Sequence, residues 1–354
     1  MFIYILLALF GYFFAFLELS TNKKNRNEKL LLFFAYIFFS VLLTLLQGLR
    51  GEVGNDYLGY KQYYESTDVI NNNYEFGFKY LVCFFKFVNI NYNLFQFIMA
   101  IITGGIFYSY IYKKTRYPFF FLFAYFCIFF FPVNFSQLRQ QIAISVLMLF
   151  SLINKKNSKI ITIIALVLAA TFHRTCLILF TVPLMRILMK KKSKTILFIL
   201  FCITILFMLY AKVFFEIIQM LKRLTVLPPL ILNILYYYTE EMNNVGIGAG
   251  VYASFFLCII IIFFSDENYK NTFYFVIAFI LDKAGFFVVV IQRFSYYFYF
   301  NKLGLESYSN VAINKRVKGY TKLLAIFLLL TYLFLINLKY LVDAGSYIIP
   351  YRFF

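Results

Sequence analysis

Residues 2–19 read FIYILLALFGYFFAFLEL, an apolar run in which Glu18 is the one charged residue. A helix rises by about 1.5 Å per residue, so this run approaches the roughly 30 Å thickness of a bilayer's hydrocarbon core. It carries no basic leader and no small-residue cleavage site, so we expect a retained membrane span rather than a signal peptide. Comparable apolar runs recur along the whole chain.

The composition places the chain among polytopic membrane proteins. Of its 354 residues 63% are hydrophobic, including 50 Phe and 31 Tyr, and only 14% are charged. A soluble domain of this length could not bury so much apolar surface. The net charge of +19 is scattered between apolar runs, which argues against a nucleic-acid partner. With one His and five cysteines that show no paired spacing, we expect no metal site, no disulfide and no cofactor.

Clusters of Lys and Arg set the expected topology, because short basic loops stay in the cytoplasm. The clusters lie at 23–26, 113–116, 155–156, 190–194 and 315–318. They predict an all-α polytopic membrane protein, a single integral membrane domain over 1–354 with about 12 transmembrane helices and both termini outside. The expected spans are 2–19, 30–49, 93–112, 117–133, 136–153, 159–172, 175–189, 195–212, 248–264, 271–291, 294–312 and 320–339.

Two longer extracytoplasmic loops are predicted, at 50–92 and 212–248, and loops of this kind carry substrate-binding groups in many proteins. Residues 75–90 are too few to cross comfortably, so we expect a short interfacial helix within the first loop. The stretch 294–312 is polar for a span. Either it crosses beside a water-filled cavity, or it lies flat and the span count falls by one.

Four arginines occupy positions where apolar segments should meet the outer water. They are Arg50, Arg139, Arg174 and Arg293. Arginine is costly near lipid and cannot shed its charge. Four of them on one rim predict a site that holds an anion.

The stretch after the second span, residues 50–60, reads RGEVGNDYLGY. Its glycines permit a tight turn with close backbone approach. Asp56 precedes Tyr57 and Tyr60, whose spacing puts both rings on one helical face. Rings beside a carboxylate suit a sugar, whereas the same pattern also fits an ordinary helix cap and an aromatic belt at the membrane interface.

Two further residues are candidate acids or bases. Glu75 begins the predicted interfacial helix, where it is either a carboxylate held near Asp56 or a first-turn acid paired with Lys79. His173, the only histidine, falls at an outside joint between two spans. A histidine titrates near neutral pH and can act as acid or base. The alternative is a wet, amphipathic side chain at the interface.

Residues 134–141 read NFSQLRQQ and begin the fifth predicted span. Arg139 falls in the first turn of that helix, where the helix dipole and free N–H groups favour a phosphate. The alternative is an arginine that snorkels to lipid headgroups. Gln140 beside it is a candidate sugar contact. Arg293, among tyrosines, is by itself an ordinary interface anchor and gains meaning only from sharing the rim.

Five stretches in this order carry a family resemblance. They are Arg50–Tyr60, Tyr74–Phe78, Leu138–Ala143, His173–Thr175 and Gln292–Tyr297. In them the chain resembles the EpsG/Wzy-type polysaccharide polymerases of bacterial envelopes. The resemblance implies a glycosyltransferase at the outer face of the bacterial plasma membrane. It would join oligosaccharide repeat units linked to undecaprenyl diphosphate into an O-antigen, a capsule or an exopolysaccharide.

The expected partners are the lipid-linked glycan and membrane lipid; a chain-length regulator and a flippase of the same pathway stay open. We hypothesise that the four arginines bind the diphosphate without a metal. One of three bases then accepts the proton of the acceptor sugar's hydroxyl group. The candidate bases are Asp56, His173 and Glu75, and the candidate sugar contacts are Tyr57, Tyr60 and Gln140.

Three other classes compete with this hypothesis. A flippase or transporter of lipid-linked oligosaccharide also needs arginines, but it would spread them along a path through the membrane. A membrane-bound acyltransferase usually needs a His and an acid deep within a span. A structural scaffold would not need arginines among polar side chains at the rim.

Overall fold

The computed structural model describes residues 2–20, 25–154, 158–183, 198–199, 201–206, 216, 220, 254–255, 258–259, 261–262, 269–285, 289–299, 319–343 and 351. The chain divides into two compact units, and each is treated by itself. Unit 1 comprises Met1–Leu177 and Arg316–Phe354, and unit 2 comprises Ile178–Lys315. The regular elements of the described residues are helices.

Unit 1 contains most of the described helices. They are α1 (Phe2–Ser20), α2 (Arg26–Gly48), α3 (Tyr57–Glu65), α4 (Phe76–Phe87), α5 (Tyr92–Lys114), α6 (Pro118–Ile128), α7 (Leu138–Ile153), α8 (Lys159–Ala170) and α17 (Gly319–Asp343). Two further helical segments join them. The π-helix η1 spans Phe130–Phe135, and the 3-10 helix η2 spans Arg174–Thr181. The last residues of η2 belong to unit 2, because this part of unit 1 ends at Leu177.

Four helices of unit 1 are long and apolar enough to cross a membrane. They are Phe2–Ser20, Arg26–Gly48, Tyr92–Lys114 and Gly319–Val342. Three more apolar helices, α6, α7 and α8, are shorter. These elements confirm a helical membrane protein with several spans, and the total of twelve spans stays a prediction.

Helix α6 is the centre of unit 1. Pro118 occupies its first turn, where a missing N–H costs nothing. Its residues Phe119 to Cys127 are all buried, which is what a helix without a polar face requires. It packs against α1, α5 and α17. Glu18, the charged residue of the first span, accepts a hydrogen bond from the Phe120 N–H at 2.8 Å and so caps this helix.

A buried polar network includes Asn134 of η1. Within η1, Pro132 supplies no N–H for regular helical bonding. Asn134 Nδ2 donates to Gln47 Oε1 at 2.8 Å, and Gln47 Nε2 donates to Gln141 Oε1 at 2.9 Å. The Tyr125 hydroxyl donates to Asn134 Oδ1. The network ties the end of α2 to the start of α7.

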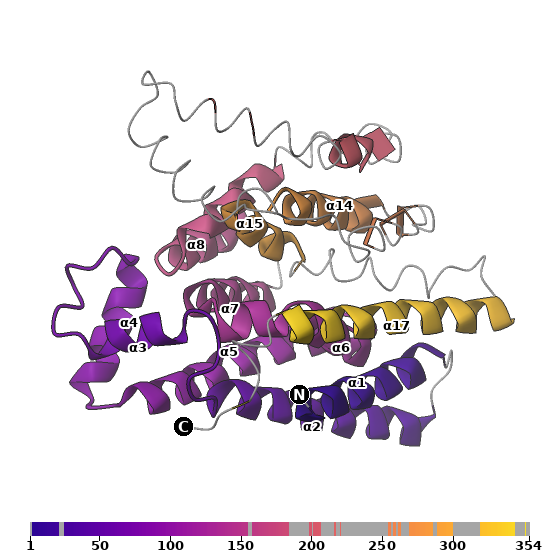
Figure 1. The fold of residues 1–354 in the computed structure, drawn as a ribbon, viewed down its shortest axis with the longest axis horizontal. Helices are drawn as coiled ribbons and strands as arrows, with labels where there is room; N and C mark the ends of the chain where they lie inside the picture. Colours follow the sequence, from indigo (N-terminus) through magenta and orange to yellow (C-terminus); the bar gives the residue numbers. More distant parts are fainter. Residues whose placement is uncertain are drawn as a thin grey trace. The chain divides into compact units, whose positions relative to one another are not determined.

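Figure 1 shows α3 and α4 at the end of unit 1 where α2 ends and α5 begins. The short helix predicted at 75–90 is present as α4, and its position at the membrane interface stays a prediction. The predicted seventh span, 175–189, begins instead as the 3-10 helix η2. The extracytoplasmic loop predicted at 212–248 lies outside the described residues, except for positions 216 and 220.

In unit 2, α14 (Tyr269–Ala284) and α15 (Val289–Tyr299) form an antiparallel pair. Gln292 Nε2 donates to Asp282 Oδ1 at 3.2 Å, while Tyr274 stacks on Phe298 farther from the turn. The predicted single span 271–291 is therefore wrong in its second half. The reason is the turn at Gly285, where a Cβ would lie 2.4 Å from the Gln292 Cβ.

Candidate functional site

The Glu75 carboxylate, at the start of α4, is the centre of a cluster that three segments of unit 1 build. Arg139 Nη1, from the first turn of α7, forms an ion pair with Glu75 Oε2. His173 Nδ1, just after α8, lies 3.3 Å from Glu75 Oε1, and the Arg174 backbone N–H donates to the same oxygen at 3.4 Å. We call Glu75, Arg139 and His173 the Glu75 cluster.

The cluster is largely removed from solvent. The side chains of Glu75 and His173 are 9% and 8% exposed, and that of Arg139 is 19% exposed. Burial by itself raises the pKa of the Glu75 carboxyl, but the hydrogen bond from His173 and the charge of Arg139 outweigh it and lower the pKa to about 2. Glu75 is thus ionised at neutral pH with both oxygens engaged, which makes it a poor base.

A close backbone contact brings Glu75 to His173. The Gly77 N–H donates to the Thr171 carbonyl oxygen at 2.7 Å. A Cβ on Gly77 would lie 2.4 Å from Thr171 Oγ1, so only glycine allows α4 to approach the end of α8. Phe78, the next residue, is buried at 1% exposure and anchors the first turn. Each fixed residue of the Glu-x-Gly-Phe sequence therefore has a structural role.

A second glycine seats the loop that follows α2. Gly54 has a φ of +107° and a Cβ there would lie 2.1 Å from the Phe135 carbonyl oxygen. The tight turn expected from the sequence is present, and it packs on η1 just before Arg139.

Arg139 lies where the sequence analysis placed it, in the first turn of α7. Besides its ion pair with Glu75, its Nε donates to the Tyr60 hydroxyl at 3.4 Å. Its guanidinium carbon lies 4.3 Å from the centre of the Tyr74 ring, a cation–π contact. An acid already balances this charge, which differs from the open diphosphate clamp that we expected.

Arg50 is also placed differently from a clamp residue. It is 3% exposed, and its Nη1 donates to the backbone oxygens of Asn134 at 2.6 Å and Gln47 at 3.4 Å. Its guanidinium carbon lies 4.9 Å from the centre of the Phe135 ring. These contacts connect α2 to η1 through Arg50, because its Nη1 donates to backbone carbonyls and the residue is buried rather than open to a surface.

The predicted sugar contacts are buried in protein. Tyr57 is 2% exposed with its ring against Tyr92, and Tyr60 is 7% exposed with its ring against Phe78. Gln140 is 1% exposed. The aromatic face of α3 packs on side chains of α4 and α5, and contact of these residues with a sugar stays a prediction.

Asp56 occupies the N-cap position of α3 and is partly exposed. Burial raises the pKa of Tyr60, the neighbouring Arg139 lowers it, and the charge of Asp56 raises it again. The charge of Asp56 therefore acts on Tyr60, so Asp56 lies at the same end of unit 1 as the Glu75 cluster.

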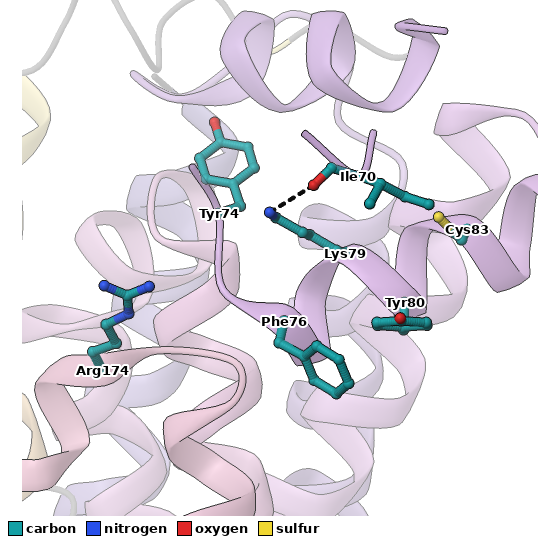
Figure 2. A pocket seen from close by; sticks show the side chains of 7 residues that line it. All are labelled: Ile70, Tyr74, Phe76, Lys79, Tyr80, Cys83 and Arg174. Atoms are coloured by element: carbon teal, nitrogen blue, oxygen red, sulfur yellow. Dashed lines mark hydrogen bonds between the residues drawn. The ribbon is translucent and has the colours of Figure 1, made fainter. Parts of the chain in front are cut away.

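A pocket of about 260 Å³ adjoins the cluster (Figure 2). Its lining residues are Ile70, Tyr74, Phe76, Lys79, Tyr80, Cys83 and Arg174. In Figure 2, Arg174 reaches in from the segment after α8, on the other side from Phe76, Lys79 and Tyr80 of α4. Lys79 Nζ donates to the Ile70 carbonyl oxygen at 2.7 Å. Tyr74 belongs to both places, because its ring lies under Arg139.

The fourth arginine, Arg293, lies in α15 of unit 2, so it is described apart from the Glu75 cluster. Within the described ranges, no three His, Cys, Asp or Glu side chains come together as metal ligands.

Sequence reasoning missed Lys79 as a pocket residue and read it only as an ion-pair partner of Glu75. It also missed the direct pairing of Glu75 with Arg139. One signal was available for that pairing: an isolated acid and an isolated arginine at the same rim, each costly without a partner.

Unit 1 therefore defines a helical membrane protein with a buried charge cluster and a cationic pocket at one end of its helices. The chain belongs to the EpsG family, whose model matches residues 33–353. This family is membrane-bound and of the polysaccharide-polymerase type. The chain matches none of the curated proteins and none of the solved structures with which it was compared.

Proposed function

We propose that this chain is a membrane glycosyltransferase that joins undecaprenyl-diphosphate-linked oligosaccharide repeat units into a surface polysaccharide, at the outer face of a bacterial plasma membrane. Family membership and the membrane-spanning helices support the general role. The observation that carries the site is the Glu75 cluster, in which an ionised acid joins Arg139 and His173 from separate segments.

The proposed reaction is a single displacement at the anomeric carbon of the donor. The acceptor hydroxyl oxygen forms the new bond to that carbon, and the bond from the carbon to the diphosphate oxygen breaks. The electron pair of the broken bond leaves with the polyprenyl diphosphate. The acceptor's proton passes to a base on the protein, and cations offset the charge that grows on the diphosphate.

We assign the base to His173. With its proton on Nδ1, facing Glu75 Oε1 at 3.3 Å, the imidazole would accept the acceptor's proton at Nε2. Glu75 is then a positioning residue, which holds the ring and stabilises the imidazolium that forms. His173 is only 6% exposed, so this assignment requires the side chains around it to part when the acceptor binds. The alternative base is Asp56, which is more exposed.

Arg139 has two roles in this proposal. It balances Glu75, so that the acid stays ionised beside His173. Its guanidinium also covers Tyr74, which lines the pocket, and so joins the cluster to the place where the substrate would enter.

Polymer formation by the purified chain in detergent tests the proposal and separates it from transport. A detergent micelle has no second compartment, so a flippase would have nothing to do there. With lipid-linked repeat units as both donor and acceptor, we expect a ladder of oligomers on a gel. Repeat units that remain single with a folded protein would reject the polymerase and leave the flippase or transporter of lipid-linked oligosaccharide as the alternative.

A further inference from the structure

The pocket beside the Glu75 cluster carries two cationic side chains that do not belong to the cluster. Arg174 is exposed, and the described residues give its guanidinium no acidic partner. Lys79 faces the same pocket from α4. Arg139, by contrast, is already paired with Glu75. An incoming phosphate therefore meets its strongest uncompensated charge at Arg174, with Lys79 across the pocket (Figure 2).

The volume of the pocket limits what it can hold. At about 260 Å³ it is smaller than the roughly 300–1,000 Å³ of sites that enclose a whole drug-sized ligand. It has room for a phosphate group and its immediate neighbours, but not for an oligosaccharide repeat unit.

An apolar stripe leads away from the pocket along α4. Phe76 and Tyr80 line the pocket and are 66% and 58% exposed, and the stripe continues with Phe84 at 60% and Phe87 at 87%. Spacings of four, four and three residues keep these rings on one side of the helix for about 16 Å. The opposite side of α4 is buried, with Phe78, Val82 and Phe85 in the core.

We propose that this pocket and stripe bind an isoprenoid diphosphate, with the diphosphate between Arg174 and Lys79 and the isoprenoid chain along Phe76, Tyr80, Phe84 and Phe87. This inference rests on the proposed function, and it assigns the lipid carrier of that reaction to particular residues. Charge complementarity places the headgroup in the pocket. The continuity of the exposed rings with the pocket lining gives the chain a path that starts at the headgroup.

The cysteines of the chain offer a direct way to locate the ligand. Cys83 lines the pocket and is partly exposed, whereas Cys127, Cys176 and Cys258 are buried. Cys202, in unit 2, is the other partly exposed thiol. In full-length protein carrying Cys202→Ser, the rate of N-ethylmaleimide labelling therefore reports on the occupancy of the pocket.

The experiment measures this labelling rate in detergent with farnesyl diphosphate, inorganic diphosphate or farnesol as probe. We expect farnesyl diphosphate to protect Cys83 at a concentration about tenfold lower than inorganic diphosphate does, and farnesol to protect weakly. Equal potency of the two diphosphates would reject the stripe. Protection by farnesol as strong as that by farnesyl diphosphate would reject the cationic subsite.

Variants assign each part, with matched controls. Arg174→Ala should raise the protecting concentration of both diphosphates by about tenfold, whereas Lys61→Ala, a cation of α3 outside the pocket, should not. Phe84→Ala with Phe87→Ala should remove the advantage of the farnesyl chain. Phe34→Ala with Phe38→Ala, at two exposed rings of α2, should leave it unchanged. All these side chains are exposed or partly exposed, so the variants should fold.

Labelling needs no acceptor and no turnover. A failure of the isoprenoid site can therefore be distinguished from a failure of the proposed function. Protein that is protected as described but makes no polymer would reject the polymerase and keep the isoprenoid site. Protein that makes polymer while Arg174→Ala leaves protection unchanged would reject the site alone.

Discussion

The guanidinium of Arg139 is paired with the carboxylate of Glu75, although 64 positions separate the two residues in the sequence. Each is mostly buried, so each would be costly without the other. Together they fix the start of α7 against the start of α4. They also decide which charges at this end of unit 1 stay available for a substrate.

The pairing predicts a strong coupling between the two positions. Arg139→Ala or Glu75→Ala alone leaves a buried charge unpaired and should destabilise the protein by about 3 kcal/mol, because breaking a buried ion pair typically costs that much. The double variant removes both charges and should be less destabilised than the sum of the two. Thermal denaturation of the purified protein in detergent measures this cycle. Additive effects would show that the two side chains do not interact.

Glycine positions give a second prediction. Gly77→Ala puts a Cβ 2.4 Å from Thr171 Oγ1 and 2.9 Å from the Thr171 carbonyl oxygen, so it should separate α4 from α8 and lower both stability and activity. Gly59→Ala in α3 is the matched control, because no atom lies within 4 Å of its added Cβ. We expect Gly59→Ala to be neutral or to stabilise by about 0.5–1 kcal/mol, since alanine is the better helix former. A neutral Gly77→Ala would contradict the close approach.

The titration of Glu75 predicts how stability depends on acid. Its pKa is lowered from the ordinary 4.5 to about 2 in the folded protein, so the folded state holds the carboxylate more favourably than the unfolded state does. That contribution to the free energy of unfolding is fully present above pH 4.5 and is lost as the pH falls toward 2.

Denaturation midpoints measured between pH 6 and pH 3 should therefore fall more steeply for the unmodified protein than for Glu75→Gln. Glu52→Gln, at an exposed acid in the same loop, should keep the steep fall. Parallel curves for Glu75→Gln and the unmodified protein would remove the assigned stabilisation of the carboxylate.

The choice of base gives a fourth prediction. General-base catalysis is worth about 10²–10⁴-fold in rate, so His173→Gln should lower the rate of polymer formation by at least about 100-fold. Asp56→Asn should change it by only a few-fold. The reverse pattern, with Asp56→Asn inactive, would move the base to Asp56.

Much of unit 1 could be predicted from the sequence. The lengths of apolar runs and the positions of basic clusters located α1, α2, α5 and α17 to within a few residues, because hydrocarbon thickness fixes the length of a span. The same reasoning could not divide 271–291, since the turn at Gly285 depends on packing between α14 and α15 rather than on hydrophobicity. It also gave no sign of the π-helical turn Phe130–Phe135, which contains Pro132 where a span was expected to end.

The sequence predicts which residues belong to the candidate site better than it predicts their roles. Charge at the rim pointed to Glu75, Arg139 and His173, but sequence spacing cannot say which charges pair with each other. Arg139 was expected to be open and is paired, whereas Arg174 is the exposed arginine of the pocket. The spacing of Tyr57 and Tyr60 puts both rings on one helical face, which fits a sugar platform, yet a face of rings serves a protein core equally well.

The most direct test of the account is the length of polysaccharide made by cells that carry Glu75→Gln, compared on a gel with cells that carry Glu52→Gln. Glutamine keeps the shape of the side chain and removes the charge that holds Arg139 and His173. We predict single repeat units, or polymer reduced at least about tenfold, for Glu75→Gln, and a normal ladder for Glu52→Gln. A normal ladder from Glu75→Gln, with the protein present in the membrane at its usual level, would contradict a catalytic site built on this carboxylate.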